Sequence, residues 1–422
     1  MDRHEIVIIG AGLAGLVAAR DLLRTGHKVI VLEARNRVGG RTWTVPFEAA
    51  GCAVDLGAEW VAPDHHTTVV KELQAYGLRL ETSPAQPTTA EAAPLMPAED
   101  LRQWLDQLSK AANAIDVSAP DWYRGGSSMD LPVTQCLREM NVSQECTDAF
   151  LAHSFALQGG HPDEYSMLNL LHEFAAFGGI EQAFSAAEYR VAGGAQALAN
   201  AVAREIGASI QLDWEVQCIR QEASGVVVEG PRGALNAELA IVAMPVNVLS
   251  AIKIDLSLPA ETRAVIADGH AGRAAKGWAA AKLPHPLLSV GWPDAIEVYS
   301  RAGSQSDAIC TFGVALPDHE TALERGWSAV NQRHPDVRFL GAFLSHDWVQ
   351  DPFARGTWLS MAPGQATGIH ALSNMPPPCL FAGGDLSRRW YGWMEGALTS
   401  GQDAARRAHG FLESGALIPA SA

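Results

Sequence analysis

The chain has few cysteines, and none of them belongs to a pattern that binds metal or forms a redox pair. Its 422 residues contain six cysteines, scattered at positions 52, 136, 146, 218, 310 and 379. No Cys-x-x-Cys pair occurs, and no spacing matches a metal site. Scattered free thiols are typical of a reducing compartment. We therefore expect a cytoplasmic protein without a metal site.

Positive charge and long apolar runs are also scarce. The chain carries 31 Lys and Arg against 47 Asp and Glu, which gives a formal net charge of −16. An acidic chain binds poorly to nucleic acid and to anionic membrane surfaces, so we expect neither as a partner. No apolar run approaches the roughly 18 residues that span a bilayer. Polar residues 2–5 lead directly into the first apolar run, and we expect no signal peptide before it.

What the chain does have, at its N-terminus, is a dinucleotide-binding pattern. A short strand over 5–9, apolar from Ile6 on, leads into Gly10-Ala-Gly12-Leu-Ala-Gly15, then an apolar helical pattern, then a second strand that ends in Glu33. Gly10 permits a tight turn, Gly12 lets the backbone approach a pyrophosphate, and Gly15 lets helix and strand pack closely. Glu33 is placed to accept hydrogen bonds from ribose hydroxyls. This order predicts a dinucleotide whose pyrophosphate lies at the helix N-terminus.

A second glycine turn, Arg35-Asn-Arg-Val-Gly39-Gly40-Arg41-Thr42, follows directly. Its glycines and arginines suit a cofactor that extends beyond its first nucleotide, with arginines beside phosphate or ribityl oxygens. With this turn and the segment Asp55-Leu-Gly-Ala-Glu-Trp60, the sequence resembles the flavin-containing amine oxidases, a family of monoamine, polyamine and L-amino-acid oxidases. The resemblance implies FAD as the cofactor, with the segment up to Trp60 passing its isoalloxazine ring.

The resemblance implies further cofactor contacts in the middle and near the end of the chain. A valine at the position of Val216 contacts the adenine side in the family, and Asp385 with the Gly384 backbone would bind the ribityl or pyrophosphate end. A helix that begins near Trp393 would point its N-terminal dipole at the flavin ring. The predicted cofactor-binding residues are Gly10, Gly12, Leu13, Ala14, Gly15, Glu33, Ala34, Arg35, Gly39, Gly40, Arg41, Thr42, Gly57, Ala58, Glu59, Trp60, Val216, Gly384, Asp385, Trp393, Met394 and Ala397.

The fold class that we expect is α/β, with a discontinuous Rossmann-like FAD-binding domain and an α+β substrate domain. A chain of this length suits two domains. We assign segments 1–81, 189–266 and 372–413 to the FAD-binding domain, 82–188 and 267–371 to the substrate domain, and 414–422 to a tail. Composition predicts a loop over 82–100, periodicity predicts mainly helix over 101–188, and apolar runs predict strands at 210–212, 215–219 and 226–228.

The C-terminal helix predicted after Trp393 has a face with almost no side chains. Gly392, Gly396 and Gly401 lie four and five residues apart. Because glycine has no Cβ, a flat ligand or another stretch of backbone can approach this face closely.

The resemblance also implies the residues that carry the chemistry. Lys276 stands where the family has a lysine that holds a water against flavin N5, and a cation there stabilises charge during reoxidation by oxygen. Trp358 and Trp393 stand at the two aromatic walls of the substrate site, where many relatives have tyrosines. Some relatives attach FAD through a cysteine near the position of Thr357. Threonine cannot do so, and Cys379 falls in a predicted strand, so we expect non-covalent FAD.

The sequence therefore predicts an FAD-dependent amine oxidase. A small-molecule amine would give up a hydride from its α-carbon to flavin N5, and O2 would be reduced to H2O2. An L-amino-acid oxidase is an alternative, which requires an arginine for the substrate carboxylate, with Arg124, Arg190 and Arg338 as candidates. A flavin-dependent desaturase or isomerase and a non-catalytic flavoprotein scaffold are further alternatives. Family resemblance also suggests a homodimer.

Overall fold

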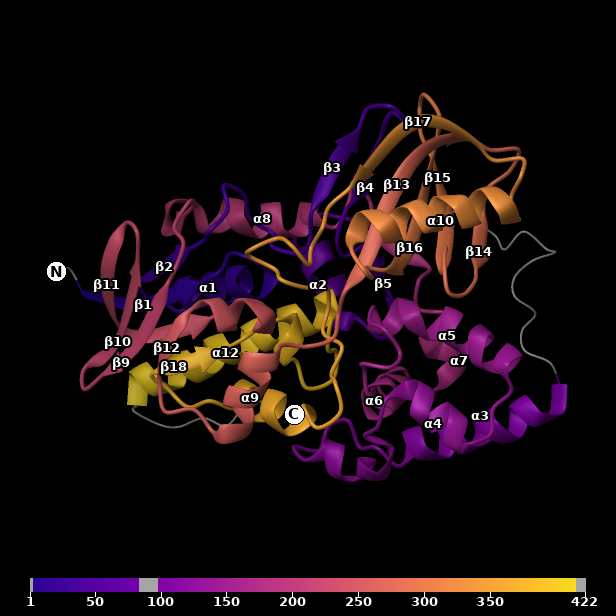
Figure 1. Cartoon of the computed structure of the whole chain (residues 1–422). Coiled ribbons are helices and arrows are strands. Elements are labelled where there is room, and N and C mark those ends of the chain that lie inside the picture. Colours follow the sequence, from indigo (N-terminus) through magenta and orange to yellow (C-terminus); the bar gives the residue numbers. More distant parts are fainter. Residues whose placement is uncertain (1–2, 83–97, 415–422) are drawn as a thin grey trace.

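One large sheet forms the half of the molecule drawn on the left of Figure 1. The structure is a computed structural model that describes residues 3–82 and 98–414. The strand order is β12-β9-β10-β11-β1-β2-β8, and β18 pairs with the far end of β11. The strands are β1 (Arg3–Ile9), β2 (Val29–Leu32), β8 (Ile210–Gln211), β9 (Cys218–Glu222), β10 (Gly225–Gly230), β11 (Gly233–Val242), β12 (Lys253–Asp255) and β18 (Cys379–Phe381).

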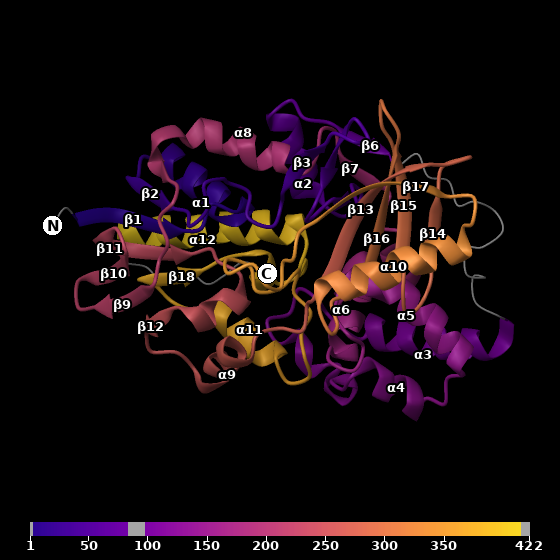
Figure 2. The same cartoon turned by 45° about the horizontal axis from the view of Figure 1, so that its top comes forward.

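The centre of this sheet is parallel and is covered on both faces. Strand β1 pairs in parallel with β2 and β11, and its side chains alternate between two cores. Ile6 and Ile8 belong to one core, whereas Val7 and Ile9 belong to the other. A strand buried on both sides needs a continuous apolar run, which 6–9 supplies. The helices around the sheet are α1 (Leu13–Arg24), α2 (Thr67–Ala75), α8 (Gln196–Ile206), α9 (Ala260–Asp268), α11 (Ala366–Ser373) and α12 (Met394–Ser414). Figure 2 shows α8 and α9 on opposite sides of the sheet.

The glycine-lined face of the C-terminal helix allows the close contact between α12 and α1. A Cβ placed on Gly401 would lie 2.3 Å from the backbone oxygen of Ala14, and one on Gly396 would lie 1.9 Å from the oxygen of Trp390. Both distances are far below ordinary contact, so neither position accepts a side chain. The expectation that another backbone approaches this face is confirmed at Gly396 and Gly401, whereas Gly392 precedes α12 and lies against the Trp358 side chain.

A second sheet, antiparallel, lies in the upper right of Figure 1. Its order is β14-β15-β16-β13-β17, and α10 covers one face. The elements are β13 (Ala274–Lys282), β14 (Leu288–Val290), β15 (Glu297–Ala302), β16 (Asp307–Val314), β17 (Arg338–Ser345) and α10 (His319–Arg333). Along β13, Gly277 meets Leu323 of α10, whereas Lys276 and Trp278 face the other way. This alternation directs Lys276 into the interior of the molecule.

A helical block completes the molecule in the lower right of Figure 1. It consists of α3 (Ala98–Asn113), α4 (Val133–Glu139), α5 (Gln144–Gln158), α6 (Met167–Phe177) and α7 (Ile180–Phe184). The prediction of helix over 101–188 is confirmed. Small strands join the parts: β3 (Thr44–Phe47) with β4 (Cys52–Asp55), and β5 (Trp60–Val61) with β7 (Tyr189–Val191) and β6 (Leu80–Thr82).

The α/β fold class is confirmed, and the strands of the large sheet come from three stretches of sequence. The domain boundaries stay a prediction. Most of the predicted loop 82–100, and the tail beyond 414, lie outside the described residues. One strand differs, because β9 begins at Cys218 rather than at 215. The amides of Asp213 and Trp214 instead donate to the carbonyls of Arg35 and Glu33, so this stretch crosses the end of β2.

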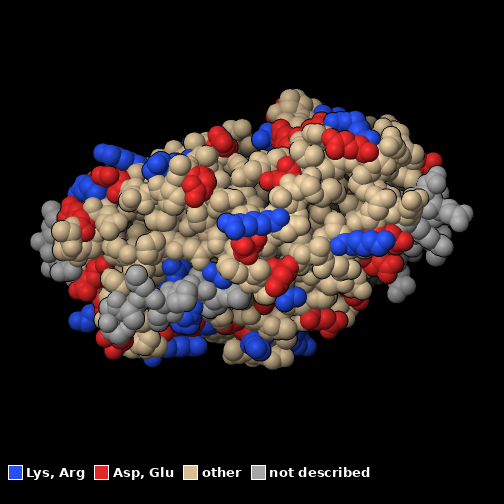
Figure 3. Space-filling model, turned by 90° about the horizontal axis from the view of Figure 1, so that it is seen from below, with Lys and Arg blue, Asp and Glu red and all other residues tan. Residues whose placement is uncertain are grey.

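The charge of the surface is mixed. On the face seen in Figure 3, Lys and Arg side chains are interspersed with Asp and Glu and form no large patch of one sign. Among the described helices, none is long and apolar enough to cross a membrane.

Candidate functional site

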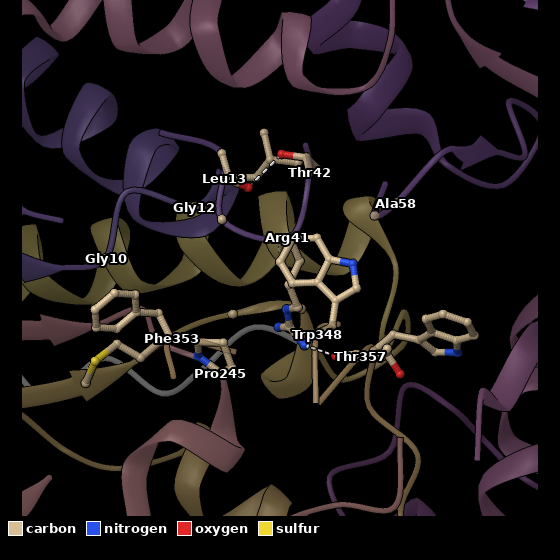
Figure 4. Close-up of a pocket in the computed structure, with 18 of the residues that line it drawn as sticks. Gly10, Gly12, Leu13, Arg41, Thr42, Ala58, Pro245, Trp348, Phe353 and Thr357 are labelled. Atoms are coloured by element: carbon tan, nitrogen blue, oxygen red, sulfur yellow. Dashed lines mark hydrogen bonds between the residues drawn. The ribbon is translucent and has the colours of Figure 1, made fainter. Parts of the chain in front are cut away.

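One long cavity runs between the large sheet, the second sheet and the helical block. It begins at the glycine turn after β1 and reaches Lys276, Trp358 and Trp393. Figure 4 shows its wall, with Gly12 and Leu13 on one side and Phe353 and Thr357 on the other. Of the residues that the sequence predicts for the site, Gly15 and Asp385 do not line the cavity. All the others do, which brings the predicted cofactor and substrate residues into one continuous space.

The two ends of the first glycine turn are crowded by backbone, whereas its middle is open. Gly10 has φ +104°, and a Cβ there would lie 2.6 Å from the oxygen of Ala243. A Cβ on Gly15 would lie 2.0 Å from the oxygen of Gly10. A Cβ on Gly12 would meet nothing within 4 Å. Gly12 therefore faces free space at the N-terminus of α1, where a pyrophosphate fits, and Gly15 serves the packing of α1 against β1.

Glu33 and Val216 line the cavity beside this turn. The Glu33 carboxylate accepts hydrogen bonds from the amides of Ala11 at 2.7 Å and Arg35 at 2.9 Å. Burial raises the pKa of Glu33, and the two amides oppose that shift by stabilising the charged form. The carboxylate is thus fixed in place at the end of β2, with remaining lone pairs for a ligand hydroxyl.

Arg41, in the second glycine turn, connects the N-terminal and C-terminal parts of the chain. Its guanidinium donates to the carbonyl of Thr357 at 2.6 Å, the bond drawn in Figure 4, and to Asp385 at 2.8 Å. The other carboxylate oxygen of Asp385 accepts from the amide of Val246. Burial opposes ionisation of Asp385, but Arg41 outweighs it and holds the pKa below its ordinary value. Asp385 therefore lies behind the wall, where it fixes Arg41, and its direct contact with a cofactor stays a prediction.

Lys276 is buried and has a carboxylate partner. Its Nζ lies 2.8 Å from Glu59 Oε2 and 3.1 Å from the carbonyl oxygen of Gly57. The Tyr299 hydroxyl donates to the same Glu59 oxygen at 2.5 Å. Burial disfavours charge on Lys276, but Glu59 more than compensates and raises its pKa. Glu59, predicted as a cofactor residue, is thus also the ion-pair partner that keeps Lys276 cationic.

Two cavity residues beside Lys276 were not found from the sequence. Lys276 pairs with Phe312 across β13 and β16, and the pairing of Val298 with Thr311 places Glu297 beside Phe312. These three side chains form one row that lines the cavity. Burial raises the pKa of Glu297 to about 7, with Lys276 opposing the shift. The period-two alternation of the strands would have placed Glu297 on this face only once the strand register was known.

Trp358 and Trp393 both line the cavity, and each indole N–H has an acceptor. Trp358 Nε1 donates to the carbonyl of Leu157 at 2.9 Å. Trp393 Nε1 donates to the Glu173 carboxylate at 2.7 Å. The Trp393 ring lies 4.8 Å from the ring of His66, centroid to centroid. Their acceptors come from the helical block, a region in which the sequence analysis identified no chemistry.

No cysteine thiol is placed to attach a flavin within the described residues. None of the six cysteines lines the cavity, and Cys379 lies in β18 as expected. The Thr357 hydroxyl accepts from the amide of Ala274 at 3.2 Å.

The three arginines named as carboxylate ligands of an amino-acid substrate do not line the cavity either. Arg190 is buried against Glu81, Arg124 pairs with Asp121 at the surface, and Arg338 is exposed on β17.

A dinucleotide-binding turn that opens into a cavity with aromatic walls and a buried lysine is typical of a flavin-dependent oxidoreductase. The family model described as flavin containing amine oxidoreductase matches residues 13–409. The chain therefore belongs to the flavin-containing amine oxidoreductase family, and the predictions of an enzyme and of a flavin cofactor are confirmed.

Relatives that are named as oxidases or dehydrogenases align along almost the whole chain. Pseudooxynicotine dehydrogenase from Pseudomonas sp is 26% identical, over 97% of this chain and 87% of its own. (S)-6-hydroxynicotine oxidase from Paenarthrobacter nicotinovorans is 26% identical, over 95% of this chain and 98% of its own.

Solved structures share the fold. Putrescine oxidase bound to putrescine matches with a TM-score of 0.83 at 23% identity, over 96% of this chain and 98% of its own. Cyclohexylamine oxidase from Brevibacterium oxydans matches with a TM-score of 0.83 at 24% identity, over 98% of this chain and 100% of its own. The cytoplasmic location and the homodimer stay predictions.

Proposed function

We propose that this protein is an FAD-dependent amine oxidase. A neutral amine with a hydrogen on its α-carbon loses that hydrogen as a hydride and loses a proton from nitrogen, which leaves an imine that water hydrolyses. FAD, when bound, accepts the hydride and passes two electrons to O2, which becomes H2O2 with two protons. The observation that carries this proposal is the single cavity that joins the dinucleotide glycines to Lys276, Trp358 and Trp393.

The cofactor would be held without a covalent bond. The turn at Gly12 and the N-terminus of α1 would bind the pyrophosphate, and Glu33 would bind the adenosine ribose. The backbone near Val216 would contact the adenine. The segment 57–60 and the N-terminus of α12 would hold the isoalloxazine ring. The absence of cysteine from the cavity wall supports non-covalent binding.

The chemistry at the other end requires the exclusion of water and a fixed positive charge. The indoles of Trp358 and Trp393 provide apolar faces that hold an uncharged amine and keep water out. Lys276 keeps its charge through Glu59 and would stabilise the negative charge that develops as oxygen is reduced. A cation held in a buried site acts more strongly than one in water, because the local dielectric is low.

The alternative of an L-amino-acid oxidase has less support. Its carboxylate-binding arginine would have to be Arg35, Arg41 or Arg355, which line the cavity. Arg35 is already paired with Asp351, and Arg41 with Asp385, whereas Arg355 is exposed. The row beside Lys276 instead offers the carboxyl group of Glu297, which in its ionised form repels an anionic substrate.

Anaerobic mixing of the holoenzyme with a panel of amines and L-amino acids tests the proposal. We expect amines to bleach the flavin and air to restore the colour with formation of H2O2. Bleaching by amino acids alone would overturn it in favour of the alternative. A reduced flavin that persists in air would show a dehydrogenase that uses another electron acceptor, and bleaching by neither class would contradict amine oxidation.

A further inference from the structure

Trp393 is held at its edge by a buried carboxylate of the helical block. Its Nε1 donates to Glu173 Oε1 at 2.7 Å, and Glu173 lies in the middle of α6. Glu173 does not line the cavity, so it lies behind the indole rather than in the substrate space. His66 and Phe177 contact the Trp393 ring, with centroids at 4.8 and 5.5 Å. The ring is thus packed on its sides, and the hydrogen bond fixes its rotation.

Trp358 is held in a similar way by the C-terminal end of α5. Its Nε1 donates to the carbonyl of Leu157, one of the last carbonyls of a helix, which have no partner within the helix. Gly159 ends α5 with φ +62°, and a Cβ there would lie 2.4 Å from the Trp358 ring. The indole therefore lies directly against the end of α5, and only glycine at position 159 leaves room for it.

Gln158 connects the two anchors. It follows Leu157 in the chain, and its side-chain Nε2 donates to Glu173 Oε2 at 2.7 Å. Its Oε1 accepts from Asn169 and, at 3.5 Å, from Ser360, two residues after Trp358. Gln158 is fully buried. The acceptor of Trp358 and the acceptor of Trp393 are thus joined through one residue, although the two tryptophans come from separate C-terminal segments.

A buried glutamate such as Glu173 costs stability, which a purely structural role would not require. Glu173 is 7% exposed, and the groups of the described residues that act on its charge are Trp393 and Gln158, with no cation among them. Burying a carboxyl group without a cation is costly, and an apolar residue would fill the same space at less cost. Its two oxygens instead accept one N–H each, from Trp393 and from Gln158.

We propose that Leu157, Gln158 and Glu173, which we call the indole frame, set the orientation and spacing of the two aromatic walls, and that Glu173 is a positioning residue for Trp393. This inference rests on the proposed function in so far as the walls bind the amine. It also explains why tryptophan suits these positions. An indole donates from the side of its ring, whereas a tyrosine hydroxyl lies on the ring axis and cannot reach the same acceptor with the ring in place.

Glu173 is the group of this cluster that titrates near neutral pH. Burial raises its pKa to about 8, against which the bonds from Trp393 and Gln158 act. Burial lowers the pKa of His66, on the other side of Trp393, to about 3, and likewise lowers that of His172, beside Glu173 in α6, to about 3. Burial raises the pKa of Tyr165 far above its ordinary value. A change at the Trp393 indole between pH 6 and 10 that Glu173→Gln abolishes, while Glu297 still titrates, would therefore report on Glu173.

Two substitutions of Glu173 test its positioning role in kinetics. Glu173→Leu removes the acceptor, and we expect the limiting rate of anaerobic flavin reduction by an amine to fall about tenfold or more, because small displacements of a bound substrate cost large factors in rate. Glu173→Gln keeps an acceptor oxygen for the Trp393 indole. The Gln158 and Asn169 amides can rotate together, so that Gln158 accepts from the new amide and donates to the otherwise unpartnered Asn169 oxygen, and we expect a rate within about threefold of the wild type. Tyr165→Phe is the matched control, because it alters a buried residue of the same block without touching either indole.

A spectroscopic measurement tests the same contact without any turnover. In holoenzyme with ¹⁵N-labelled indoles, Trp393→Phe identifies the Trp393 resonance. We expect that resonance to move with pH in the wild type and in Tyr165→Phe, but not in Glu173→Gln. A Trp393 resonance whose position changes neither with pH nor in Glu173→Gln would overturn the proposal. Reduction kinetics in Glu173→Leu that equal those of the wild type would also overturn it. If no amine reduces the wild-type flavin, the proposed function is wrong. The Trp393 resonance then tests by itself whether Glu173 positions the indole.

Discussion

The two ends of the cavity are built by different means. At the nucleotide end, the wall includes the backbone of Gly10 and Gly12, and Gly15 lies behind it in the same short glycine turn. At the reaction end, the wall is made of side chains from distant segments, and Lys276 is joined to a residue 217 positions away in the chain. Backbone sites depend on local conformation, whereas side-chain sites depend on buried polar contacts that only the folded chain assembles. Substitutions should therefore have different consequences at the two ends.

The largest effects are expected within the first glycine turn. There, substitution of Gly15 should lower stability, whereas substitution of Gly12 should lower FAD affinity. Gly15→Ala places a methyl group 2.0 Å from a backbone oxygen, and we expect a loss of about 3 kcal/mol or more in the free energy of unfolding. Gly12→Val points into open space, so the apoprotein should keep its stability while FAD affinity falls about a hundredfold, or about 2.7 kcal/mol. Thermal unfolding of the apoproteins and flavin titration measure the two effects. If both variants lost stability and FAD affinity to the same extent, the assignment of Gly15 to packing and of Gly12 to cofactor binding would be contradicted.

The next effect concerns the ion pair at the reaction end. In Lys276→Met, we expect the rate of flavin reoxidation by oxygen to fall about a hundredfold while reduction by the amine changes much less, because the lost cation acts on the developing negative charge. The same variant leaves Glu59 buried without its partner, which should cost about 3 kcal/mol of stability. Double-mixing stopped-flow kinetics and thermal unfolding separate the two losses.

The matched control for this prediction is the double variant Lys276→Met with Glu59→Gln. Removing both charges should restore much of the stability, because no unpaired buried charge remains, but it should not restore the oxygen rate. An oxygen rate that recovers together with stability would mean that Lys276 acts on structure alone.

The last effect arises at Glu173 and becomes visible only when the pH is changed. Its pKa is raised from 4.5 to about 8, so between these values the folded state holds a proton that the unfolded state has lost. The contribution of this group to stability is therefore fully present below the unfolded pKa and is lost as pH rises through 8. Glutamine does not titrate. The stability of Glu173→Gln relative to wild type should thus increase from pH 5 to pH 9 by about 4 kcal/mol, because each unit of pKa shift corresponds to about 1.4 kcal/mol. A difference that is constant across this range would contradict a raised pKa.

The same contrast explains what the sequence could predict. The dinucleotide-binding pattern and the second glycine turn were identified because their residues lie close together in the sequence. Residues of both turns line the cavity together with Lys276, Trp358 and Trp393. The family resemblance supplied those last three residues. Residue spacing alone would not have placed a lysine of β13 beside two tryptophans from other segments.

The partners of these residues could not be predicted. Glu173 and Gln158 lie in a helical stretch whose pattern indicates only burial, and Tyr299 and Glu297 lie on a strand whose register is set by its neighbours. Asp385 was identified, but its carboxylate turns toward Arg41 instead of into the cavity. Each of these contacts joins residues that are far apart in sequence, and local patterns carry no information about such pairs.

A crystal structure of the anaerobically reduced holoenzyme with a bound amine would test the central claim most directly. The account predicts electron density for the amine between the indoles of Trp358 and Trp393, at the end of the cavity that contains Lys276, with FAD along the glycine turns. An amine bound elsewhere, or indoles that have left their acceptors at Leu157 and Glu173, would contradict it.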